Sequence, residues 1–270
     1  MNELEKFNSE VSKNIESLGR SEKIKQITSE WVAATIPLKY TYNFQWLGRP
    51  IIQYPQDIVA LQEVMWRVKP DLIIETGIAH GGSLILSASI LAMLDYQEAA
   101  QNKATLDPHN PSRRVLGIDI DIRPHNRYEI EAHPLSQRID MLQGSSIEGS
   151  IVDEVKKVAS QFDRVMVVLD SNHTHDHVLK ELEAYAPLTS VGSYCVVMDT
   201  AIEDVSAEHF IDRPWGPGDN PKTAVWEYLE KCSREGIKGS DGNALNFKID
   251  KKIDKKTLIS VAPGGFLARI

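Results

Sequence analysis

The chain has 270 residues, of which 42% are hydrophobic and 25% charged, which is ordinary for a globular protein and excludes a disordered chain. Its net charge of −8 and pI near 5.5 argue against a nucleic-acid partner, because an acidic surface repels a phosphate backbone. With only Cys195 and Cys232, no signal-like N-terminus and no apolar run approaching about 18 residues, the sequence predicts a cytoplasmic protein without disulfides or a transmembrane segment.

Residues 1–40 carry a helical pattern. Apolar side chains recur at spacings of three and four over residues 4–18 and again over residues 24–31. Such stripes pack against a core or against another subunit. We therefore expect an N-terminal helical extension over residues 1–40, a main domain over residues 41–270, and a homo-oligomer.

Residues 40–57 are rich in aromatics and prolines and have no clean period, which predicts an ordered loop or short strands. Ordered aromatic loops often line pockets, and plugging the end of the core is an equally good role for Trp46 and Tyr54. A helix is expected next over residues 55–68, where apolar residues share one face.

Residues 69–86 predict a buried strand, a tight glycine turn and a helix. The apolar run 72–74 lacks polar alternation, as expected for a strand covered on both faces. Glu75 at its end would repel a pyrophosphate but would suit a cationic ligand, and small residues follow in the register of a phosphate-binding fingerprint. We predict a cofactor-binding loop, with a plain connecting turn as the alternative. The predicted cofactor-binding residues of this loop are Glu75, Gly77, Ala79, Gly81, Gly82 and Ser83.

After the glycine loop, a helix is expected over residues 83–95 and a polar surface loop over residues 97–114. The strand that follows ends on acid. A carboxylate at that place can accept hydrogen bonds from ribose hydroxyls, and we assign this role to Asp119, with Asp121 as the second choice.

Residues 141–146 predict a third strand and its turn. This topology places an adenine at that turn, and we assign Ser145 and Ser146 to this part of the site. A covering helix is expected over residues 152–162, and it precedes the clearest buried strand of the chain, residues 164–169.

That strand ends at Asp170, and three alternating histidines follow it. Ligands in open α/β sheets lie beyond the carboxyl ends of the strands, so we assign function to Asp170 and His173, which come nearest to the strand end. For His175 and His177 we favour solvated positions at the start of a helix.

Residues 192–200 predict a neighbouring strand that ends at Asp199. Asp170 and Asp199 would then converge on one crevice, which suggests a hard cation such as Mg²⁺. Residues 213–221 have the composition of a mobile lid over an acceptor, and a helix is expected over residues 222–231.

The last residues are expected to form strands over residues 247–250, 257–261 and 264–269, the last two paired through a turn at residues 263–265. The lysine pairs within residues 251–256 lie beside acidic residues and predict a solvated hairpin. A terminal antiparallel hairpin on a parallel sheet is more typical of a methyltransferase than of a dehydrogenase.

With these residues assembled, the chain resembles the cephalosporin hydroxylase family, a branch of the class I S-adenosylmethionine (SAM) dependent methyltransferases that includes rhamnosyl O-methyltransferases. The resemblance runs from about residue 43 to the end and is most specific at residues 69–83, 117–121, 169–173 and 213–217. It implies an α/β fold with a Rossmann-like, doubly wound, mostly parallel sheet, a C-terminal antiparallel hairpin, and SAM as the cofactor.

The resemblance also implies roles for individual residues. Related members hold Mg²⁺ with an acid that matches Asp170 and an acidic pair that matches residues 198–199, and they use the histidine that matches His173 as the base. Asp170 is expected to serve the cofactor site as well. Met198 replaces the expected carboxylate, which leaves Asp170 and Asp199 as the predicted metal ligands.

The sequence therefore predicts an enzyme that transfers a methyl group from SAM to a hydroxyl of a small molecule, either a sugar or a natural product, with Mg²⁺ assistance. Two alternatives stay open. A nicotinamide-dependent oxidoreductase would share the glycine loop and the acidic strand end, but it would be expected to lack Glu75 and the terminal hairpin. A non-catalytic SAM-binding or scaffold protein is the other alternative, and the sequence does not identify the methyl acceptor.

Overall fold

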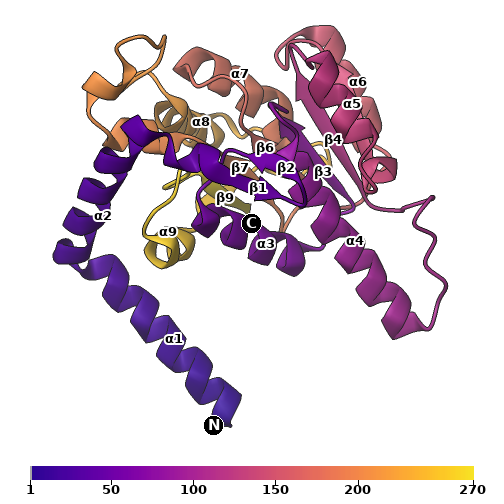
Figure 1. The fold of residues 1–270 in the computed structure, drawn as a ribbon, viewed down its shortest axis with the longest axis horizontal. Coiled ribbons are helices and arrows are strands. Elements are labelled where there is room, and N and C mark those ends of the chain that lie inside the picture. The colour runs from indigo at the N-terminus through magenta and orange to yellow at the C-terminus, as the bar shows by residue number, and fades with distance from the viewer. Residues whose placement is uncertain (1) are drawn as a thin grey trace.

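The computed structural model of the protein describes residues 2–270 (Figure 1). Its N-terminal arm consists of α1 (Glu3–Arg20) and α2 (Glu22–Thr35), as the apolar spacing predicts. The side chains of Asn2 and Ser21 accept hydrogen bonds from the first turns of α1 and α2, respectively. Because Ser21 is an N-cap with extended backbone, the chain changes direction between the two helices.

Within residues 2–270, the centre of the fold is a seven-stranded sheet with the strand order β5-β4-β3-β6-β7-β9-β8. Strands β3 to β7 run parallel, whereas β9 lies antiparallel to both β7 and β8. The strands are β3 (Leu72–Thr76), β4 (Arg114–Asp119), β5 (Ile139–Gln143), β6 (Val165–Leu169), β7 (Tyr194–Val197), β8 (Phe247–Ile249) and β9 (Phe266–Arg269). The expected Rossmann-like, mostly parallel sheet with an antiparallel C-terminal pair is confirmed.

Helices cover both faces of this sheet. One face packs against α3 (Pro55–Val68), α4 (Gly82–Asn102) and α5 (Pro124–Glu131), and the other against α6 (Gly149–Ala159), α7 (His175–Tyr185) and α8 (Pro221–Glu235). The side chains of β3 alternate between the two cores, with Ile73 on one side and Leu72 and Ile74 on the other. A strand covered twice needs no polar alternation, which explains its sequence. Within residues 2–270, no helix combines the length and hydropathy needed to span a bilayer.

A short antiparallel pair, β1 (Phe44–Trp46) and β2 (Arg49–Ile51), packs against α4. The Arg49 guanidinium donates to the His80 carbonyl oxygen at 2.7 Å, which ties this pair to the glycine loop. A Cβ atom on Gly82 would lie 2.2 Å from the Pro50 carbonyl oxygen. The short strands expected within residues 40–57 are therefore confirmed, and they cover the start of α4.

The surface loop expected over residues 97–114 begins later than predicted. Helix α4 continues to Asn102, so residues 97–102 are helical. This segment holds glutamate, glutamine and alanine, whose high helix propensity outweighs its polarity.

The predicted solvated hairpin and strand over residues 251–261 are wrong. Residues 251–257 form α9 (Lys251–Thr257), which the Asp250 side chain caps by accepting a hydrogen bond from the Lys252 amide at 3.2 Å. The lysines of α9 form ion pairs with acids of other helices, as between Lys255 and Glu16 of α1 at 2.7 Å. Packing against α1 and α3 thus turns a charged segment into a helix.

Residues 258–265 form a loop, and β8 pairs with β9 across α9 rather than through a tight turn at residues 263–265. Two groups in this loop, the Ser260 hydroxyl and the Val261 amide, donate to the buried carboxylate of Asp57 at 2.5 and 2.9 Å. A backbone amide that serves a buried acid in this way is lost to strand pairing.

Candidate active site

The carboxyl ends of β3, β6 and β7 meet at one edge of the sheet, where a cavity of about 780 Å³ opens. The sheet side of the cavity is lined by part of the glycine loop and by Asp170, His173 and Asp199. The opposite side comes from parts of residues 32–42 and 201–215. Its size is that of a small-molecule site.

The glycine loop is shaped by close backbone contacts. Gly77 has φ +89°, and a Cβ atom there would lie 1.9 Å from the carbonyl oxygen of Asp170. Ala79 also has positive φ, at 45°, and Gly81 is the N-cap of α4 with φ +82°. Gly77, Ala79, Gly82 and Ser83 line the cavity. Only glycine at position 77 lets the loop approach the end of β6 this closely.

Glu75 lies under the loop. Its side chain is 2% exposed and accepts a hydrogen bond from the Ser87 hydroxyl, and burial raises the pKa of its carboxyl group. Glu75 lines a small inner cavity together with Gln53, Ser83 and Asp170, and these three also line the large cavity. The carboxylate is therefore one layer away from any occupant of the large cavity.

Asp119, at the end of β4, holds the glycine loop in place. Its Oδ2 atom accepts hydrogen bonds from the amides of Ile78 at 2.8 Å and Ala79 at 3.2 Å, and its Oδ1 atom accepts one from the Asp121 amide at 3.0 Å. A carboxylate has about four lone-pair sites, so beside these three bonds it can accept about one more. The next side chain, Ile120, is 72% exposed.

Ser145 and Ser146 follow β5 but are not among the described residues that line the large cavity. The Ser146 side chain is buried, with its hydroxyl 3.1 Å from His177 Nε2, and its carbonyl oxygen accepts a hydrogen bond from Tyr185. The structure thus places the two serines at the turn after β5, with the Ser146 side chain turned toward α7.

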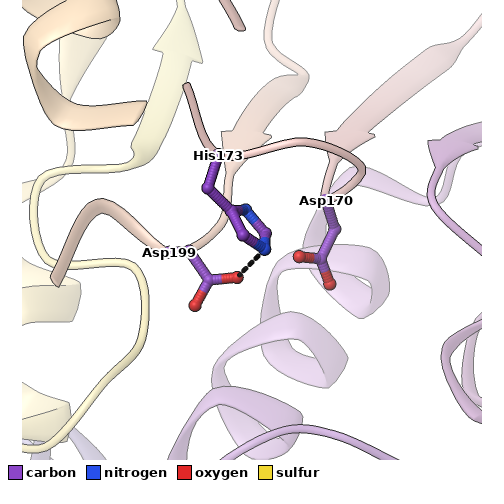
Figure 2. A group of neighbouring side chains, drawn as sticks. All are labelled: Asp170, His173 and Asp199. Carbon is purple, nitrogen blue, oxygen red and sulfur yellow. Dashed lines mark ion pairs between the residues drawn. The ribbon is translucent and has the colours of Figure 1, made fainter. Parts of the chain in front are cut away.

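Asp170, His173 and Asp199 come together at the ends of β6 and β7 (Figure 2). His173 Nε2 lies 3.5 Å from Asp199 Oδ2, and one candidate ligand atom from each of the three side chains falls within 4.8 Å of the others. The His173 ring makes an edge-to-face contact with Trp215, with ring centroids 4.7 Å apart. Burial and the neighbouring Asp199 carboxylate raise the pKa of Asp170 well above its usual range.

This group has the donor chemistry of a divalent-cation site. Two carboxylates repel one another in a partly enclosed space, and a cation between them would relieve that repulsion. Met198, where the resemblance implies a third acid, is 1% exposed and packs in the hydrophobic core. The residues present therefore fit a hard cation through oxygen ligands, with one protein carboxylate fewer than expected.

The other two histidines, expected to be solvated, are only 22% and 19% exposed, and both have hydrogen-bond partners. His175 bridges two helices, with Nδ1 2.8 Å from Thr223 Oγ1 and Nε2 3.1 Å from Glu227 Oε2. His177 Nε2 lies 3.2 Å from the Ser171 hydroxyl. Neither histidine is among the described residues that line the large cavity, although Ser171 is, and the contacts of both rings join α7 to its neighbours.

The aromatic stretch over residues 40–57, for which pocket lining and core packing both stayed open, forms part of the opposite wall. The Tyr40 ring packs edge-on against the Trp31 ring, with centroids 4.9 Å apart, and its centroid lies 6.0 Å from that of Tyr54. Both tyrosines line the cavity. Tyr54 therefore lines the pocket, whereas Trp46 packs against the core. The N-terminal arm thus contributes to the pocket, which its helical stripe alone did not signal.

The loop expected to act as a lid does reach the site, since Arg213 and Trp215 line the cavity. Gln53 was also missed, although it lies in the predicted pocket loop. It is 4% exposed, and its Nε2 atom donates to Asp170 Oδ2 at 3.3 Å. The contribution of Gln53 to the site becomes visible only from its burial in the structure.

Comparisons with known proteins agree with this geometry. Residues 38–270 match the family described as Rhamnosyl O-methyltransferase/CmcI. A rhamnosyl O-methyltransferase of Mycobacterium tuberculosis is 27% identical over 214 residues, covering 79% of this chain and 73% of the relative. The enzyme of that name from Mycobacterium leprae is 23% identical over 227 residues, covering 83% of this chain and 82% of the relative. A solved CmcI structure with Mg and SAM superposes with a TM-score of 0.52 at 15% identity, covering 85% of this chain and 77% of that one, and supports the fold. The chain belongs to the Rhamnosyl O-methyltransferase/CmcI family.

Proposed function

We propose that the protein transfers the methyl group of SAM to a hydroxyl group of a sugar or sugar-bearing natural product. The observation that carries this proposal is that the glycine loop and the group Asp170, His173 and Asp199 line the same cavity. Its relatives are named as rhamnosyl O-methyltransferases, which supports a sugar hydroxyl as the acceptor.

The cofactor is held by the glycine loop and the two strand ends that follow it. The small residues Gly77, Ala79 and Gly82 let a ligand approach the backbone, and Ser83 lines the same cavity. Asp119 accepts a hydrogen bond from a ribose hydroxyl at its remaining lone-pair site, while the exposed Ile120 side chain offers an apolar surface to the base. Ser145 and Ser146 border the adenine. Glu75 supports the cationic end of the cofactor from beneath the loop.

His173 is the general base. An alcohol is a weak nucleophile at neutral pH, so its oxygen forms the new bond to the methyl carbon, as the carbon–sulfur bond breaks, only when a base takes the hydroxyl proton. The Nε2 atom of His173 accepts that proton. Asp199, 3.5 Å away, stabilises the imidazolium that results, and Trp215 limits the orientations of the ring.

Asp170 and Asp199 are the residues that would hold Mg²⁺. When bound, the ion supplies positive charge that lowers the pKa of the acceptor hydroxyl and orients it. Since Mg²⁺ prefers oxygen ligands, the nitrogen of His173 stays free for the proton. The acceptor itself is enclosed by the aromatic wall that includes Tyr40 and Trp215.

The test is a titration of the purified protein with SAM and, separately, with NAD, followed by a screen of nucleotide sugars and glycosylated natural products for uptake of labelled methyl. We expect saturable SAM binding, no NAD binding and methyl transfer to at least one sugar hydroxyl. Saturable NAD binding without SAM binding would instead favour the oxidoreductase. SAM binding with no transfer across the screen and no turnover of SAM would favour a non-catalytic binder.

A further inference from the structure

Gln53 is a buried polar side chain next to the acidic group. It lies between β2 and α3 and is 4% exposed. Its Nε2 atom donates to Asp170 Oδ2 at 3.3 Å, whereas its Oε1 atom is buried without a hydrogen-bond partner among residues 2–270. A buried amide oxygen with no donor is unfavourable, so the protein part of the site does not satisfy the Gln53 amide in this orientation.

The spacing of these atoms fits an octahedral ion. Mg²⁺ holds oxygens at about 2.0–2.1 Å, so neighbouring ligands lie about 3 Å apart and opposite ones about 4.2 Å apart. The Gln53 amide nitrogen lies 3.3 Å from Asp170 Oδ2, which is close to the separation of neighbouring ligands. A half-turn of the amide about its terminal bond exchanges nitrogen and oxygen, and it brings Oε1 to that position.

Because position 198 is a methionine, the site lacks one of the carboxylate ligands that the family resemblance implies. The Met198 side chain is packed in the core, so the end of β7 offers the site one carboxylate from Asp199. We propose that Gln53 Oε1 is a third protein ligand of the divalent cation, with Asp170 and Asp199, and that it takes the place left by Met198. This inference rests on the proposed function. An amide oxygen is neutral, so two carboxylates balance the ion's charge and the site as a whole stays uncharged.

The test uses Mn²⁺ as the probe with the full chain, without SAM or acceptor, and follows free Mn²⁺ by electron paramagnetic resonance. Gln53→Ala and Gln53→Met should each weaken Mn²⁺ binding by about tenfold or more, because both remove the oxygen and the second keeps the volume. Gln53→Glu should tighten it. Adding Met198→Glu to Gln53→Met should restore binding, since it supplies an oxygen from β7.

Gln56→Ala is the matched control. Its Oε1 atom is likewise buried without a partner among the described residues, but Gln56 does not line the large cavity. This variant should bind Mn²⁺ as the wild type does. The inference is overturned if the wild type does not bind Mn²⁺, if Gln53→Met binds it unchanged, or if Gln56→Ala loses as much affinity. SAM binding is measured in parallel. If the wild type binds Mn²⁺ but not SAM, the proposed function is wrong and the role of Gln53 as a metal ligand still stands.

Discussion

The two sides of the cavity are built differently. The sheet side follows strands such as β3 and β6, whose residues are all buried, so its side chains are fixed by the core. The opposite side comes from short 3₁₀ turns, η1 (Ile36–Leu38) and η2 (Tyr40–Asn43), and from the loop after β7. Leu38 and Ile211, which lie next to lining residues of that side but do not line the cavity themselves, are 76% and 81% exposed. If the proposed function holds, we expect the chemistry on the sheet side and the choice of acceptor on the opposite side.

The largest effect should come from the sheet side. Replacing His173 with alanine removes the proposed base and should lower turnover by roughly 10²–10⁴-fold, with SAM affinity nearly unchanged. Single-turnover kinetics and calorimetric titration with SAM measure the two quantities. His175→Ala is the control, because that ring bonds to α8 outside the cavity. Wild-type turnover in the His173 variant would remove this residue from the mechanism.

The buried carboxyl group of Asp57, which binds the loop at residues 260–261, should make stability depend on pH. The pKa of this carboxyl group is raised to about 7, mainly by burial; the Ser260 and Val261 hydrogen bonds oppose this shift, and the Asp199 and Asp254 carboxylates add to it. Because the folded pKa exceeds the unfolded one, stability falls as pH rises from about 4 to 7.

The expected loss for Asp57 between pH 5 and pH 8 is about 2–3 kcal/mol, measured by urea unfolding. Asp57→Asn should flatten the profile, since the amide does not titrate. An equally steep fall in that variant would assign the pH dependence to other groups.

Removing the proposed contact between Asp119 and the cofactor should have a smaller effect. Asp119→Ala removes an acceptor for charge-assisted hydrogen bonds and the anchor of the Ile78 and Ala79 amides. Losing about 1.5–3 kcal/mol corresponds to a ten- to hundredfold weaker SAM affinity, measured by calorimetry. Asp121→Ala, at an exposed neighbour, is the comparison. If only the Asp121 variant loses affinity, the ribose role passes to that residue.

Removing a bound metal ion should lower the rate of methyl transfer. Chelation with EDTA should lower methyl transfer by about tenfold or more, and excess Mg²⁺ should restore it, because the acceptor hydroxyl loses a polarising charge. Met198→Glu should tighten Mg²⁺ binding by adding a hard ligand. Transfer that is indifferent to exhaustive chelation would leave Asp170 to orient His173 or the cofactor instead.

The smallest effect is expected on the opposite side of the cavity. Tyr40→Leu removes a ring that packs against Trp31 and lines the cavity. The acceptor KM should rise by about two- to tenfold, as for loss of an aromatic contact, with kcat and SAM affinity unchanged. Tyr128→Leu, an exposed tyrosine that does not line the cavity, is the control among the described residues. A fall in kcat with constant KM would place Tyr40 in the chemistry.

The sheet side of the cavity could be predicted from the sequence better than the opposite side. The strand, loop and helix around Glu75 and Gly77 were predictable because a doubly buried strand and a glycine turn leave local marks in sequence. The convergence of Asp170 and Asp199 followed from the parallel order of β6 and β7. The aromatic wall and Gln53 depend on packing between segments far apart in the chain, which leaves no periodic signal. The helix over residues 251–257 was missed for that reason too, since its lysines are paired by α1 and α3.

The close approach of Gly77 to the Asp170 carbonyl has a consequence for how the two substrates affect one another's binding. With the loop backbone against the carbonyl of Asp170, the cofactor loop and the acid group cannot shift independently. An occupant that presses on the loop changes the position of Asp170, and an acceptor drawn to Asp170 changes the fit of the cofactor. Such coupling is reciprocal by thermodynamic necessity, so each substrate alters the affinity of the other by the same factor. We therefore expect the SAM affinity measured with and without acceptor to differ by the same factor as the acceptor affinity measured with and without SAM.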